Sequence, residues 1–212
     1  MKAPGTFLAP DPAGIDAIAR HLLGGGVALI PTETFYGLAA DPHQPRAVER
    51  IFEFKLREEG KALPLIASDV EQVDRLAPGW RTIAAALRLS ERFWPGPLSL
   101  ILPASSGLSP GVAAADRSVA VRVTSNVPAA ALARRCGSAL IATSANRSGR
   151  PPHSNARQAW LELGASAELW VLDAGPTPGG APSTLIDPRT NPPNVVRQGA
   201  ITLGTSDLNT AL

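Results

Sequence analysis

Apolar residues recur along the chain in two patterns, and the first is typical of amphipathic helices. In residues 11–26, Ile15, Ile18 and Leu22 stand three or four positions apart and would share one helical face. The glycines at positions 24–26 would end this helix. The same spacing predicts further helices over residues 45–55, 68–77, 79–94, 127–137 and 155–164.

Short apolar runs typical of buried strands lie between these helices. They occupy residues 27–31, 63–68, 98–102, 119–123, 139–144, 168–173, 183–187 and 194–201. Strands that alternate with helices favour an α/β layer fold, with parallel pairing wherever a helix intervenes. The last two strands follow each other without a helix, which indicates a mixed sheet. We therefore expect one α/β domain over residues 1–212, with flanking helices on a twisted, mixed, mostly parallel sheet.

The composition is that of a globular protein. Apolar residues make up 44% of the 212 positions and charged residues 18%, whereas a disordered chain has fewer apolar residues. No apolar stretch approaches the roughly 20 residues that span a bilayer, and residues 1–14 lack the apolar core of a signal peptide. The single cysteine, Cys136, excludes an internal disulfide and fits a reducing compartment. We expect a cytoplasmic protein that does not bind membranes.

A cluster of hydroxyl groups follows the first predicted strand. The stretch "PTETFYGLAAD", residues 31–41, carries Thr32, Thr34 and Tyr36, with Glu33 among them. Loops at the ends of buried strands are where α/β proteins hold ligands, because the strand is a rigid support. The alternative is a polar turn that caps a helix.

Three cations gather at the end of the second predicted helix. Lys55 and Arg57 stand at that end, and Lys61 follows four residues later. The helix dipole favours cations there, so a capping role on a solvated surface is one interpretation. The other is an anion clamp, since three cations at one helix end can surround a polyphosphate. Glu58 and Glu59 weaken the cationic field but are candidates for holding Mg²⁺.

A second polar cluster, "TSANRSG", follows the predicted strand at 139–144. Ser144, Asn146 and Ser148 supply hydrogen-bond donors and acceptors but no strong acid or base, so they suit ligand positioning better than proton transfer. The alternative is a turn that leads into a helix.

Arg122 lies inside the apolar strand pattern "VAVRV", where an unpaired charge would be costly. It therefore needs an anionic partner, either a structural carboxylate or a carboxylate or phosphate of a ligand. The same question applies to Arg197 in the last predicted strand, although an edge strand could expose it.

Several familiar catalytic signatures are absent or incomplete. The segment at 107–111 matches G-x-S-x-G, but Pro110 has no backbone N–H for an oxyanion, so a serine hydrolase is not expected. The chain has no P-loop motif. His21, His43 and His153 are scattered, without zinc-ligand spacing, and we predict no resident metal.

The segment "DAGPTPGGAP", residues 173–182, is rich in glycine and proline. Only about 30 residues follow it, too few for a second core. We interpret it as a loop over a site, which is how lids are often built.

In this order the motifs resemble the threonylcarbamoyl-AMP synthase family, the YrdC-like domain. The resemblance runs from residue 31 to about residue 201 and is carried by "PTETFYGLAAD", "IFEFKLREEGK", "FWPGPLSLIL", "VAVRV", "TSANRSG", "STLID" and "VVRQGAI". It implies a twisted, mostly parallel sheet with a concave basic face. It also implies that ATP, L-threonine and bicarbonate are substrates, that Mg²⁺ accompanies ATP, and that the product serves the threonylcarbamoyl modification of tRNA.

The resemblance assigns roles to particular residues. The residues that would hold threonine are Thr34, Arg122, Ser144 and Ser183. Those that would hold ATP are Arg57, Lys61, Ser118, Asn146, Ser154 and Arg197, with Lys55 beside them and Lys55 and Arg57 as the catalytic pair. Leu56 and Glu58 replace a glycine and a proline that the family often has in this motif. We also expect the chain to lack the further C-terminal domain that some members carry.

Two alternatives belong to other classes of function. One is a binding module for double-stranded RNA or tRNA, which would use the basic concave face without catalysis. The formal charge of only +2 and the single tyrosine argue against it, although the pI is near 9.1. The other is carbamoyl transfer from carbamoyl phosphate, as in the related domain of hydrogenase maturation factors. The family assignment leaves room for a weak contact with tRNA and for downstream tRNA threonylcarbamoyl transferase proteins as partners.

Overall fold

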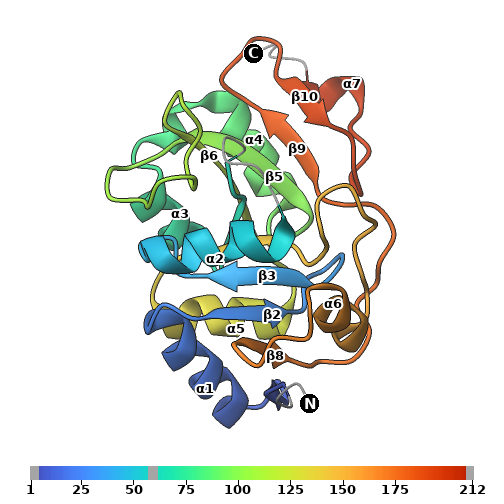
Figure 1. The fold of residues 1–212 in the computed structure, drawn as a ribbon. Helices are drawn as coiled ribbons and strands as arrows, with labels where there is room; N and C mark the ends of the chain where they lie inside the picture. The colour runs from blue at the N-terminus through green and yellow to red at the C-terminus, as the bar shows by residue number, and fades with distance from the viewer. Residues whose placement is uncertain (1–4, 57–61, 209–212) are drawn as a thin grey trace.

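A computed structural model describes residues 5–56 and 62–208 of the chain, and its centre is one ten-stranded sheet (Figure 1). In chain order the strands are β1 (Phe7–Leu8), β2 (Val27–Ile30), β3 (Gly37–Ala40), β4 (Leu65–Ala67), β5 (Leu98–Pro103), β6 (Ser118–Val123), β7 (Leu140–Ser144), β8 (Leu169–Leu172), β9 (Thr184–Asp187) and β10 (Asn194–Arg197). In space their order is β1-β8-β2-β3-β7-β4-β6-β5-β9-β10. The last two strands therefore lie at the end of the sheet opposite β1.

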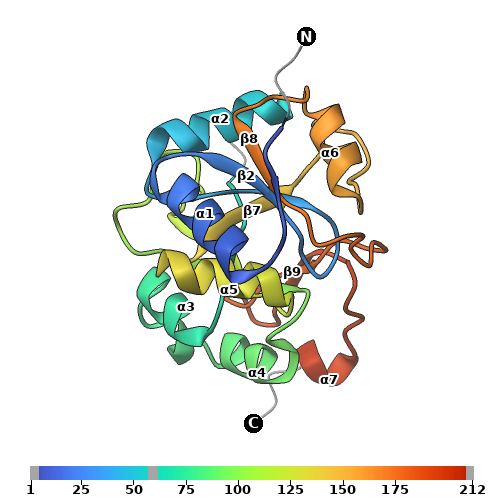
Figure 2. The same ribbon diagram turned by 90° about the horizontal axis from the view of Figure 1, so that it is seen from below.

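Helices cover both faces of this sheet. They are α1 (Pro12–Leu23), α2 (Pro45–Lys55), α3 (Val70–Leu76), α4 (Ala84–Phe93), α5 (Val127–Cys136), α6 (Ala156–Glu162) and α7 (Thr205–Leu208), with a 3-10 turn at Trp80–Thr82. Figure 2 shows α1 and α5 packed side by side on one face. Buried residues of α2, α3, α4 and α6 contribute to the core on the other face.

Alternation along the strands separates the two cores. In β2, Val27 and Leu29 point into the larger core, whereas Ala28 and Ile30 point into the smaller core under α1 and α5. A strand with both faces covered has no polar alternation, which is why these runs are continuously apolar. The prediction of an α/β domain with flanking helices is confirmed.

The sheet is mixed, as predicted, but parallel pairs do not predominate. Among the described residues, the parallel pairs are β1 with β8, β2 with β8, β4 with β6, and β5 with β9. The other five pairs are antiparallel. The excess arises because β2 and β3, like β5 and β6, are joined without a helix, and β7 inserts antiparallel between β3 and β4. The expectation of a mostly parallel sheet is wrong in this respect.

The helix predicted over residues 79–94 is divided in two. Ile83 has extended backbone angles, φ −83° and ψ 97°, between the 3-10 turn and α4. The indole of Trp80 is buried and donates a hydrogen bond to Asp74 at 2.7 Å. Tertiary anchoring of this side chain thus outweighs continuation of the helix.

In the described part of the chain, no helix combines the length and apolar character that crossing a bilayer requires.

Candidate functional site

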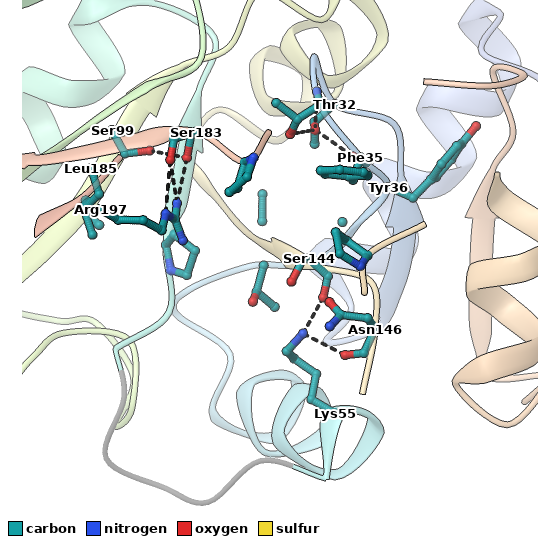
Figure 3. Close-up of a pocket in the computed structure, with 18 of the residues that line it drawn as sticks. Thr32, Phe35, Tyr36, Lys55, Ser99, Ser144, Asn146, Ser183, Leu185 and Arg197 are labelled. Atoms are coloured by element: carbon teal, nitrogen blue, oxygen red, sulfur yellow. Dashed lines mark hydrogen bonds between the residues drawn. The ribbon is translucent and has the colours of Figure 1, made fainter. Parts of the chain in front are cut away.

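An open pocket of about 910 Å³ lies where several strand and helix ends meet (Figure 3). Its wall includes the turn between β2 and β3, the end of α2, the end of β7 and the segments around Ser183 and Arg197. Ligand sites usually have volumes of about 300 to 1,000 Å³, so this pocket is large enough for a nucleotide together with a small second substrate.

Most of the predicted site residues that the structure describes line this pocket. They are Thr34, Lys55, Arg122, Ser144, Asn146, Ser183 and Arg197. Segments up to about 160 residues apart in the sequence thus meet in one hollow. Two further predicted residues, Arg57 and Lys61, lie outside the described residues together with Glu58 and Glu59.

Two residues that the resemblance assigned to ATP do not line the pocket. Ser118 is the first residue of β6, and four residue steps along the strand place it about 13 Å from Arg122. Its hydroxyl donates to Asp116 at 2.6 Å. Ser154 contributes its carbonyl oxygen, which accepts a hydrogen bond from the N–H of Thr177 at 2.9 Å. Their assignment to ATP stays a prediction.

The hydroxyl cluster of the β2–β3 turn forms one corner of the pocket. Thr32 donates to the carbonyl oxygen of Phe35 at 2.6 Å and accepts from the N–H of Thr34 at 3.2 Å. The two threonine hydroxyls lie 3.2 Å apart. These bonds fold the stretch back on itself between antiparallel strands. The stretch joins two strands and caps no helix, so the capping alternative is wrong.

Arg122 has a structural carboxylate as its partner. Its Nε donates to Glu33 Oε1 at 2.5 Å, and Thr124 Oγ1 donates to Glu33 Oε2 at 2.5 Å. Burial alone would raise the pKa of Glu33, but the charge of Arg122 and the Thr124 hydroxyl outweigh it and hold the pKa below its ordinary value. Glu33 is therefore ionised at neutral pH, and the pair is formally neutral.

Lys55 holds the turn that follows β7. Its ammonium donates to the carbonyl oxygens of Ser144 and, at 2.9 Å, Asn146, and the residue is only 3% exposed (Figure 3). Asn146 in turn donates its Nδ2 protons to the carbonyls of Arg147 at 3.0 Å and Arg150 at 2.5 Å. Its Oδ1 is buried without a partner among the described residues. This amide therefore presents an acceptor, which matches a ligand donor or a metal-bound water and not a bare phosphate oxygen.

Arg197 supplies positive charge at the opposite wall. Its guanidinium donates to the carbonyl oxygen of Ser183 at 2.8 and 3.2 Å and to the Ser183 hydroxyl at 3.1 Å. Ser99 lies 3.1 Å from the same hydroxyl. Burial first, and then the nearby charge of Arg122, lower the pKa of Arg197. Within the described residues no carboxylate pairs with Arg197, so its charge is available to a ligand anion.

Tyr36 ties the 173–182 segment to this pocket. Its hydroxyl donates to the carbonyl oxygen of Gly175 at 2.7 Å and accepts from the N–H of Ala174 at 3.1 Å. Further along, the N–H of Gly179 donates to the carbonyl oxygen of Thr34 at 2.7 Å. Gly180 and Pro182 contribute to the pocket wall. The segment thus lies against the site, as predicted.

Tyr36 gives this attachment a measurable pH dependence. Burial raises the pKa of Tyr36 from 10.0 to about 12, so the fold requires the neutral phenol while the unfolded chain ionises near pH 10. The contribution of Tyr36 to the free energy of unfolding should be constant below pH 10 and should fall between pH 10 and about 12. At pH 8, Tyr36→Phe should lose about 1 kcal/mol through its missing hydrogen bonds. Urea unfolding at pH 8 and pH 11 should show that the difference in unfolding free energy between the wild type and Tyr36→Phe is smaller at pH 11. An equal difference at both pH values would contradict the raised pKa of Tyr36.

Some pocket residues escaped the sequence predictions. Ser99 occupies a polar position inside the apolar run of β5, which is the same signal that identified Arg122. Arg150 follows the predicted "TSANRSG" motif directly and also lines the pocket. Glu33 was noticed only as part of the hydroxyl cluster, because its pairing with Arg122 depends on the fold.

Within residues 5–56 and 62–208, no group of three or more His, Cys, Asp or Glu side chains is arranged to hold a metal ion.

Comparison with known proteins identifies relatives of this chain. A sequence profile of the Sua5/YciO/YrdC family, described as "Telomere recombination", matches residues 20–199. A protein of Alkalilimnicola ehrlichii named threonylcarbamoyl-AMP synthase is 42% identical over 169 residues, which are 79% of this chain and 87% of that protein. A protein of the same name from Thiobacillus denitrificans is 40% identical over 168 residues, with the same coverage.

A solved structure shares the fold over most of this chain. The crystal structure of P. abyssi Sua5 complexed with L-threonine superposes with a TM-score of 0.83 at 32% sequence identity. The superposition covers 92% of this chain and 57% of that chain, so the chain spans less than two thirds of that protein.

Proposed function

This chain belongs to the Sua5/YciO/YrdC family, and we propose that its pocket joins L-threonine, bicarbonate and ATP into threonylcarbamoyl-AMP with release of pyrophosphate. The chain is an enzyme of the nucleotidyltransferase type, a threonylcarbamoyl-AMP synthase, as its relatives at about 40% identity are named. The RNA-binding module and the carbamoyl phosphate reaction are not favoured, because the same relatives carry the synthase name.

The reaction requires the substrates to be positioned and needs no protein nucleophile. The amine of threonine and bicarbonate give a carbamate and water. A carbamate oxygen then attacks the α-phosphate in line, and the bond to pyrophosphate breaks. Catalysis of such a transfer depends on orientation and on stabilising negative charge. This agrees with the pocket, whose described polar lining consists of hydroxyls, amides and cations.

The observation that carries the proposal is the presence of two different corners in one pocket. One corner combines the Thr32 and Thr34 hydroxyls with the neutral Arg122–Glu33 pair, which suits an amino acid. The other offers Arg197 without a carboxylate partner among the described residues, which suits phosphates. The two corners are close enough for the charge of Arg122 to lower the pKa of Arg197. Two substrates bound there would face each other.

Magnesium would enter as the complex with ATP. Its role would be to neutralise phosphate charge. The orphaned Oδ1 of Asn146 fits this proposal, because a buried amide oxygen can accept from a water of the hydrated ion.

Mass spectrometry of the products tests the function. Incubation of the protein with ATP, Mg²⁺, L-threonine and bicarbonate should give threonylcarbamoyl-AMP and pyrophosphate in equal amounts. Omission of threonine, or exclusion of bicarbonate and CO₂, should stop pyrophosphate release. Pyrophosphate release that continues without threonine would overturn the proposal.

We further propose that a tRNA threonylcarbamoyl transferase consumes the product, in the cytoplasm.

A further inference from the structure

Glu33 links two parts of the pocket wall that are distant in the sheet. It lies between Thr32 and Thr34 in the β2–β3 turn, whereas its partners Arg122 and Thr124 belong to β6 and the residue after it. Strands β7 and β4 separate β3 from β6. One carboxylate therefore joins the hydroxyl corner to the arginine across two intervening strands.

The contacts of Glu33 leave part of Arg122 available. The carboxylate takes the Nε proton, and no hydrogen bond joins Nη1 or Nη2 of Arg122 to any described residue. The side chains are 6% and 9% exposed for Arg122 and Glu33, so water screens this pair little. Arg122 can thus offer two parallel N–H groups to a ligand carboxylate while its charge is already balanced.

This charge balance separates two kinds of ligand. A neutral arginine–carboxylate pair exerts little net pull on a polyphosphate but still binds the carboxylate of a zwitterion, whose ammonium offsets the added negative charge. Arg197, whose described contacts are the neutral groups of Ser183, attracts polyphosphate instead. The two arginines of one pocket are therefore chemically different.

We infer that Glu33 is a specificity-determining positioning residue, which orients Arg122 for the carboxylate of a zwitterionic amino acid and keeps phosphate groups away from it. The inference rests on the proposed function, because it assigns the amino acid to this corner. Glu33 does not act as a base, since both of its oxygens already accept hydrogen bonds.

Calorimetric titration of Glu33→Gln tests the inference. The substitution weakens the charge-assisted hydrogen bond that orients Arg122, so the dissociation constant for L-threonine should rise at least about tenfold. Arg122 should then attract phosphate, so inorganic pyrophosphate should compete with threonine in Glu33→Gln but not in the wild type. A merely structural role would lower thermal stability without creating this competition. Threonine affinity within twofold of the wild type, or weakened affinity without competition, would overturn the inference.

Two further variants keep the test decisive. Glu71→Gln makes the same chemical change at an exposed position of α3, and it should leave both titrations unchanged. If Glu33→Gln does not fold, Thr124→Val removes one hydrogen bond to Glu33 and should weaken threonine binding about threefold with a wild-type response to pyrophosphate. An unchanged threonine affinity in that variant would refute the positioning role. A wild-type protein that makes no threonylcarbamoyl-AMP would count against the proposed function itself.

Discussion

Replacing Lys55 by methionine is expected to lower turnover by roughly a hundredfold or more, because it removes a buried positive charge from the pocket wall. Methionine has a similar length but cannot donate to the carbonyl oxygens of Ser144 and Asn146. The turn that carries both side chains would then lose its fixed position. Unpaired buried carbonyls should also lower the free energy of unfolding by about 1 to 3 kcal/mol.

Arg46→Met is the matched control, since it removes a cation from an exposed position of the same helix. Its unfolding free energy should stay within about 0.5 kcal/mol of the wild type, with normal turnover. Steady-state kinetics and urea unfolding of both variants make the comparison. Wild-type turnover in folded Lys55→Met would refute the predicted catalytic assignment of Lys55.

Gly199→Ala is expected to destabilise the protein by about 3 kcal/mol or more, because the new methyl group has no space. A Cβ at this position would lie 2.2 Å from the carbonyl oxygen of Pro182 and 2.6 Å from backbone atoms of Ser183 and Thr184. Backbone hydrogen bonds hold the same segments together, among them Ala200 N–H to Pro182 at 2.8 Å. Relief of the clash would displace Ser183 from Arg197, so turnover should fall as well.

Gly180→Ala separates this clash from ordinary backbone strain. Gly180 has φ +84°, and no described atom lies within 4 Å of the place that an alanine methyl group would take, so alanine there should cost only about 1 to 2 kcal/mol. Chemical unfolding of the two variants should rank Gly199→Ala as the less stable. The reverse order would show that the backbone near Gly199 relaxes freely.

Most helices and strands could be predicted from the sequence, but their arrangement in the sheet could not. Helices such as α2 and α5 have a clear apolar face and a defined end, so their bounds were predicted closely. Strand β1 has only two residues, too few for a periodic pattern, and β3 follows the hydroxyl cluster with small residues of low strand propensity. The insertion of β7 between β3 and β4 depends on long-range packing, which local patterns do not encode.

The site was predictable where polar residues interrupt apolar runs. Arg122 and the β2–β3 turn stood out for this reason, and both lie in the pocket. The apolar surroundings of Arg122 predicted an anionic partner, but they did not indicate whether this partner is a ligand or a structural carboxylate. Glu33 is 89 residues away, so only the sheet brings the pair together. Ser118 shows the converse, since the resemblance assigned it to ATP whereas it begins β6 outside the lining of the pocket, and that assignment stays a prediction.

The location of β9 and β10 at the far edge of the sheet affects how the protein is made. Of the buried apolar residues in the two described cores, Ile186 is the single one that follows Leu172. Ser183 and Arg197, by contrast, belong to this late part of the chain. Translation thus adds almost the whole apolar interior before it adds the wall that we propose binds phosphate.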